Sequence, residues 1–136
     1  VDSARRMDLG AGVTLDLLPR SGQGAYADVL RDHDLGLALM YTPHPSLVPI
    51  EMASAGMLTV TNSFENKTAQ ALTAISPNLI TGEPGIEAIA AALGQAAAAV
   101  EDFKRRARGS AVRWSREWDH SFDDALLERV TAFLAT

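Results

Sequence analysis

Apolar segments of strand length alternate with amphipathic segments along this chain. Strands are predicted at residues 13–18, 35–41, 57–61 and 78–81. The second of these is apolar along nearly its whole length, which is typical of a strand that helices cover on both faces of a sheet. Because a helix is predicted between each pair of strands, we expect right-handed βαβ units and a Rossmann-like parallel sheet with flanking helices.

Helices are predicted where the apolar residues recur at helical spacing. Tyr26, Val29 and Leu30 lie on one face of a short first helix. The next helix follows Ser46, a suitable N-cap, and ends at Gly56. The remaining predictions are a frayed or residual helix end at residues 1–12, helices at residues 67–75, 86–108 and 122–134, and a shared helical face for Trp114 and Trp118.

The composition limits the classes of protein to which the chain can belong. It has 136 residues, 12 Lys+Arg against 17 Asp+Glu, a formal net charge of −5 and no cysteine. The mild acidity gives no support to nucleic-acid binding, which favours a basic face. The lack of cysteine excludes disulfides and cysteine-ligated metals, so we expect a cytoplasmic protein, with peripheral membrane association of a longer protein as an alternative. No apolar run approaches the roughly 20 residues that span a bilayer.

The chain length fits one modest core. We expect a single partial domain over residues 1–136, with an α/β core at about residues 1–108 and C-terminal helices at residues 109–136. The chain starts VDSARRMDLG, without an initiator Met or the apolar region of a signal peptide. We therefore expect that it was cut from inside a longer protein.

Candidate chemistry gathers in the loop and helix after the second strand. Glu51 is either a surface carboxylate that the helix dipole stabilises or an acceptor for two vicinal hydroxyls. His44 is either a ligand for a sugar hydroxyl or diphosphate, or a solvated loop histidine. The backbone N–H groups of Ser46, Leu47 and Val48 open the helix and are suited to an anion.

Two segments carry a family resemblance. PHPSLVPIEMASAG (residues 43–56) and TVTNSFENK (residues 59–67) resemble the donor-binding segment of retaining, GT-B-fold glycosyltransferases of family 4. The nearer match is a rhamnosyltransferase-like subgroup with a P-H-P loop. The matching residues are Pro43, His44, Pro45, Ser46, Pro49, Ile50, Glu51, Met52, Ala53 and Gly56. Pro43 stands where the wider family has a second Glu that contacts the donor sugar.

The resemblance implies the C-terminal half-domain of a glycosyltransferase that binds a nucleotide-diphosphate sugar, such as dTDP-rhamnose. Glu51 would bind the ribose. Leu17, Leu18 and Pro19 would lie at the nucleobase, with a purely structural core role as the alternative for Leu17 and Leu18. Arg20 would meet phosphate or only solvent. The resemblance also implies metal-independent catalysis without a cofactor, and a saccharide acceptor bound by an N-terminal domain that this chain lacks.

Other assignments stay open. Tyr26 is interpreted as a packing residue, and Asn62, Glu65, Asn66 and Lys67 either line the same crevice or, for Asn66, cap the following helix. Aromatic residues near the C-terminus leave self-association as a possible partner interaction. The alternative function is a non-catalytic α/β interaction module. A receiver-like domain requires an acidic cluster that this sequence lacks. A sugar-nucleotide epimerase would need a glycine-rich turn in place of Leu18-Pro19-Arg20.

Overall fold

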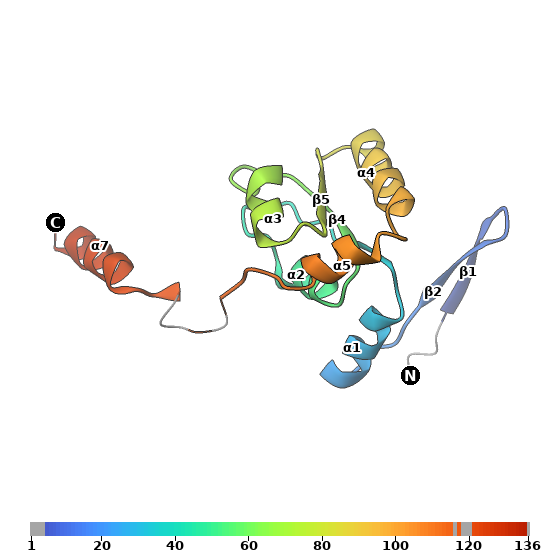
Figure 1. The fold of residues 1–136 in the computed structure, drawn as a ribbon, viewed down its shortest axis with the longest axis horizontal. Helices are drawn as coiled ribbons and strands as arrows, with labels where there is room; N and C mark the ends of the chain where they lie inside the picture. The colour runs from blue at the N-terminus through green and yellow to red at the C-terminus, as the bar shows by residue number, and fades with distance from the viewer. Residues whose placement is uncertain (1–4, 116, 118–120, 136) are drawn as a thin grey trace.

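The computed structural model describes residues 5–115, 117 and 121–135. Its centre is a parallel sheet of three strands, β3 (Leu35–Leu37), β4 (Leu58–Asn62) and β5 (Leu79–Gly82), in the order β3-β4-β5 (Figure 1). The register pairs Leu35 with Leu58 and Thr59 with Leu79. The mixed α/β architecture confirms the predicted Rossmann-like fold.

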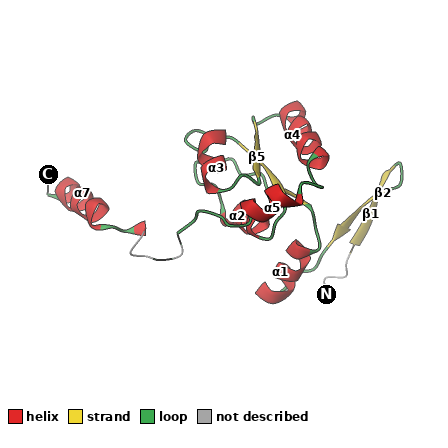
Figure 2. Cartoon of the chain, viewed as in Figure 1, coloured by secondary structure: helices red, strands yellow, loops and turns green. Residues whose placement is uncertain are grey.

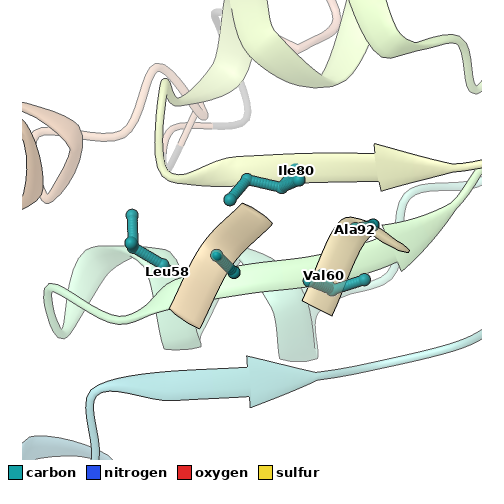
Figure 3. Packing of buried hydrophobic residues seen from close by; sticks show 5 residues of the cluster. Leu58, Val60, Ile80 and Ala92 are labelled. Carbon is teal, nitrogen blue, oxygen red and sulfur yellow. The ribbon is translucent and has the colours of Figure 1, made fainter. Parts of the chain in front are cut away.

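Helices cover both faces of the sheet (Figure 2). On one face, α4 (Ile86–Ala98) places Ala92 and Ala96 against Leu58, Val60 and Ile80 (Figure 3). On the other face, α2 (Leu47–Ser54) and α3 (Ala69–Ile75) place Ala53 and Leu72 against Leu79. All five residues of the central strand β4 are buried, as expected for a parallel strand between two helical layers.

The predicted strand at residues 13–18 exists but does not join this sheet. Strand β2 (Val13–Leu17) pairs antiparallel with β1 (Arg5–Gly10), and the two form a separate hairpin. The helix end expected in residues 1–12 is therefore wrong for residues 5–10, and residues 1–4 lie outside the described residues. The hairpin closes at Gly10, Ala11 and Gly12, which all have positive φ, and the Asp8 carboxylate accepts the N–H of Gly10 at 2.8 Å.

The strand predicted at residues 35–41 is shorter and less covered than expected. Its ladder ends at Leu37, with one further bond from the N–H of Ala38 to the carbonyl of Val60. At Met40 the side chain of Asn62 replaces the backbone of β4 as the hydrogen-bond partner. Leu37, Leu39 and Tyr41 are exposed, so the expectation of a fully buried strand is wrong for its second half.

The long helix predicted at residues 86–108 is two helices. After α4 the chain turns, and α5 (Phe103–Gly109) begins behind Asp102, whose carboxylate accepts the N–H of Arg105 at 2.9 Å. An N-cap of this kind starts a new helix in a new direction. The spacing of apolar residues does not indicate the break, because it continues at helical period across Asp102.

The other helices follow the predictions closely. Helix α1 is Gln23–Arg31, with Leu30 buried, and Gly56 ends the α2 turn at a φ of 91°. The last helix, α7 (Asp124–Leu134), begins after the capping carboxylate of Asp123 and lies apart from the sheet (Figure 1). Trp114 lies in a non-helical segment after α5, and Trp118 lies outside the described residues.

Candidate functional site

The loop before α2 is closed by His44. Ser46 occupies the predicted N-cap position, but its side chain makes no capping hydrogen bond, because its φ of 70° departs from the extended geometry of an N-cap. Its backbone N–H instead donates to Nδ1 of His44 at 3.0 Å. The His44 ring also meets the ring of Trp114 edge-on, with 6.0 Å between centroids. The predicted capping by the Ser46 hydroxyl is therefore wrong.

This contact changes the predicted anion site. Of the three backbone amides expected to face an anion, that of Ser46 is engaged by His44, while Leu47 and Val48 lie exposed in the first turn of α2. Because Nδ1 of His44 accepts a hydrogen bond, the proton of the neutral ring lies on Nε2, which can donate to a ligand. Whether His44, Leu47 and Val48 bind an anion stays a prediction.

Glu51 faces helix α1 across a hollow. The hollow has a volume of about 340 Å³, and its lining includes Tyr26, Arg31, Glu51 and Ser54. Burial raises the pKa of Tyr26, and the negative charge of Glu51 and a hydrogen bond to its carboxylate raise this pKa further. Arg31 is paired with Asp28 at 2.7 Å. A carboxylate has about four acceptor positions, so Glu51 can hold Tyr26 and still accept two hydroxyls of a ligand.

A second hollow adjoins the first at Tyr26. It has a volume of about 530 Å³ and is lined by Leu18, Pro19, Arg20, Tyr26 and Val29, together with Ser21 and Ala25. It is lined mostly by apolar side chains, and Arg20 is the charged residue of its lining. Tyr26 thus joins a carboxylate hollow to an apolar one, a role that its helical spacing alone did not indicate.

Some of the site residues predicted from the sequence line these two hollows, and others do not. Leu18, Pro19 and Arg20 line the apolar hollow, and Glu51 lines the neighbouring one. Leu17 lines neither hollow and is exposed on β2, and Leu18 is exposed too, so a purely structural core role for this pair is wrong. His44, Ser46, Leu47 and Val48 lie before and at the start of α2 and line neither hollow.

The segment after β4 lines neither of the two hollows that meet at Tyr26. Asn62 and Lys67 hold the backbone of Met40, and Thr68, not Asn66, caps α3 by accepting the N–H of Ala71 at 3.2 Å. The Lys67 side chain is buried, and this burial lowers its pKa. Among the expected crevice residues, Glu65 lines a third hollow with Tyr41 and Phe64.

Within the described part of the chain, no helix is both long and apolar enough to cross a membrane.

Comparison with known proteins identifies a relative, the O-antigen biosynthesis protein RfbC of Myxococcus xanthus, which is 33% identical over 115 residues. That alignment covers 84% of this chain and 9% of the relative, so the chain matches a small part of a much longer protein.

A family model gives the second comparison. The model of the WsaF C-terminal domain matches residues 2–94, which include the hairpin, the three parallel strands and the three hollows. The match covers more than half of the 136 residues. The chain therefore belongs to the family of the WsaF C-terminal domain, a glycosyltransferase-associated domain.

Proposed function

We propose that this chain is the nucleotide-sugar-binding part of a glycosyltransferase of polysaccharide biosynthesis. The family and the O-antigen biosynthesis name of the relative support the general role. The observation that carries the more specific proposal is the placement of Glu51 in a hollow that adjoins an apolar hollow at Tyr26. An apolar slot beside a planar acceptor suits a nucleobase with its ribose.

In this proposal the base lies against Leu18, Pro19 and Val29, and the ribose hydroxyls donate to Glu51. Arg20 in the lining of the apolar hollow supplies positive charge for a phosphate. The first turn of α2, with Leu47 and Val48, adds backbone N–H donors that favour negative charge. Together these groups hold the donor and stabilise the departing diphosphate without requiring a metal ion.

The finer proposal follows the sequence resemblance. We infer a retaining GT-B enzyme of family 4, of the rhamnosyltransferase-like subgroup, which transfers a deoxyhexose such as rhamnose from dTDP to a hydroxyl of a saccharide. The acceptor is bound by another part of the longer protein. The chain alone is then expected to bind nucleotide weakly and to transfer no sugar.

The first prediction tests the role of Glu51. Calorimetric titration with dTDP and UDP should detect binding to the unchanged chain. Glu51→Ala should weaken it about tenfold or more, because hydrogen bonds to a charged group contribute roughly 1.5–3 kcal/mol. Glu87→Ala is the matched control, since Glu87 also lies in the first turns of a helix and lines neither hollow.

The outcomes separate the two functions considered. Equal nucleotide affinity for the unchanged chain and Glu51→Ala would exclude the ribose role of Glu51. Lack of any nucleotide binding by the chain, with its fold intact by circular dichroism, would favour the non-catalytic interaction module instead.

A further inference from the structure

Two aromatic rings are in contact in the loops that follow strands β3 and β4. Tyr41 follows β3 and Phe64 follows β4, and their ring centroids lie 4.3 Å apart with an interplanar angle of 62°. Although it contacts Phe64, Tyr41 is 72% exposed. An aromatic ring that contacts one neighbour and is otherwise largely exposed is available to a ligand. The carboxyl ends of parallel strands are also the usual place for ligands in open α/β folds.

Hydrogen bonds fix the backbone at Met40, next to Tyr41, and between Phe64 and Lys67. The amide of Asn62 accepts the N–H of Met40 at 2.9 Å and donates to its carbonyl at 3.2 Å, and Nζ of Lys67 donates to the same carbonyl at 2.5 Å. Phe64 and Lys67 exchange two backbone hydrogen bonds, at 3.1 and 2.8 Å. The backbone next to Tyr41 and at Phe64 therefore needs little ordering when a ligand binds, which reduces the entropic cost of binding.

A hollow with a volume of about 380 Å³ lies beside the two rings. This volume is near the lower end of the range of small-ligand pockets. Its lining combines aromatic, hydroxyl and carboxylate groups, from Tyr41, Ser63, Phe64, Glu65, Thr68 and Glu83. The hollow shares no lining residue with the two hollows proposed for the nucleotide.

We propose that this hollow binds the pyranose ring of a saccharide, with Tyr41 and Phe64 as the apolar wall and Glu65 and Glu83 as hydroxyl acceptors. A pyranose has C–H groups that pack on the negative face of an aromatic ring, and hydroxyls around its rim that donate to carboxylates. A purely apolar ligand would leave the two carboxylates unused, and an anionic ligand would be repelled by them. The inference rests on the proposed function, because it assigns a place to the sugar that the glycosyltransferase handles.

The second prediction is that the chain binds neutral pyranosides. Methyl α-L-rhamnoside and methyl α-D-glucoside are titrated while amide NMR spectra are recorded, with sorbitol as a probe that has hydroxyls but no ring. Pyranosides should shift the amide signals of the loops that contain Tyr41, Phe64 and Glu83, and sorbitol should not. Tyr41→Ala should weaken pyranoside binding about fivefold or more, given the usual contribution of an aromatic contact.

Matched variants separate recognition from stability. Phe103→Ala removes another exposed aromatic side chain, on α5, that does not line the hollow, and should leave pyranoside binding unchanged. Glu83→Gln keeps the shape of an exposed side chain while it removes the charge, and should weaken binding of the pyranoside. Circular dichroism should give the same spectrum for all of these variants.

Donor and acceptor sugars are distinguished by a second titration with dTDP and dTDP-rhamnose. If Tyr41→Ala lowers the affinity for dTDP-rhamnose but not for dTDP, the hollow holds the donor sugar. If it lowers only the affinity for free pyranosides, the hollow holds an acceptor sugar, and the proposal that another part of the longer protein binds the acceptor is wrong. Pyranoside binding that is absent, matched by sorbitol, or unchanged in Tyr41→Ala would overturn the inference, whereas loss of dTDP binding in Glu51→Ala is a separate result that concerns the proposed function.

Discussion

At the scale of single residues, the side chain of Asn62 takes the place of a neighbouring strand as the hydrogen-bond partner of the Met40 backbone. Its Oδ1 accepts the N–H of Met40, and its Nδ2 donates to the carbonyls of Met40 and Ser63. Only a carboxamide offers an acceptor and two donors in one plane, so no other side chain of this size satisfies all these groups. Asn62 therefore allows the chain to leave the sheet after β3 without losing its backbone hydrogen bonds.

The third prediction follows from this geometry. Asn62→Leu keeps most of the side-chain volume but leaves the N–H of Met40 without its partner, and it should lower the free energy of unfolding by about 1–2 kcal/mol. Asn66→Leu, at an exposed position in the same segment, should change it by less than about 0.5 kcal/mol. Urea unfolding followed by circular dichroism measures both. Equal stability of the two variants would mean that water replaces the Asn62 amide.

Residue chemistry in the sequence indicated part of the candidate site. A carboxylate early in a helix that follows a strand makes Glu51 a candidate, the family resemblance favours its ligand role, and Glu51 does line a hollow. Tyr41 and Phe64 were not selected, because they are separated by 23 positions in the sequence and meet only through the pairing of β3 with β4. Contacts between loops depend on the strand order, which apolar spacing does not encode.

At the scale of elements, periodicity predicted most helices and strands, and local polar residues decided the differences. The parallel strands, α2, α3 and α7 follow from apolar spacing and from helix stops. The N-terminal hairpin depends on a turn at Gly10–Gly12, where the polar, glycine-containing pattern predicts a frayed helix end. Asp102 likewise starts α5, after α4 has ended at Ala98, although the alanine-rich sequence before it favours a continuous helix.

The fourth prediction tests whether Asp102 fixes the break between α4 and α5. Asp102→Ala should lower the free energy of unfolding by about 1 kcal/mol, because the N–H of Arg105 loses the capping carboxylate. Asp102→Asn retains an acceptor oxygen and should cost only a few tenths of that, since asparagine caps about as well. Thermal unfolding followed by circular dichroism compares the three proteins. A similar loss in both variants would assign the effect to the charge of Asp102 instead of its cap.

At the scale of the whole molecule, Arg106 ties together the segments that precede all three parallel strands. Its Nε donates to the carbonyl of Gly56 at 2.8 Å, and its guanidinium pairs with Asp34 at 2.7 Å. Its own carbonyl accepts from Nδ2 of Asn78 at 2.9 Å. Asp34, Gly56 and Asn78 lie just before β3, β4 and β5, so α5 secures the amino end of the sheet.

The fifth prediction compares how much the charge of Arg106 and the shape of its guanidinium each contribute to the free energy of unfolding. The Asp34 side chain is 66% exposed, so the ion pair is screened and Asp34→Asn should lower the free energy of unfolding by less than about 1 kcal/mol. The carbonyls of Gly56 and Val100, in contrast, both depend on the fixed fork of the guanidinium. Arg106→Lys keeps the charge but reaches only one of them, and should cost about 2 kcal/mol or more.

Urea unfolding in low and high salt separates the two contributions. Since hydrogen bonds to the carbonyls of Gly56 and Val100 are screened little by salt, the cost of Arg106→Lys should be nearly the same at both salt concentrations. If Asp34→Asn costs as much as Arg106→Lys and the cost falls in high salt, the ion pair is what holds α5 to the sheet. If instead only the lysine variant loses stability, the amino end of this sheet is held by the shape of one arginine.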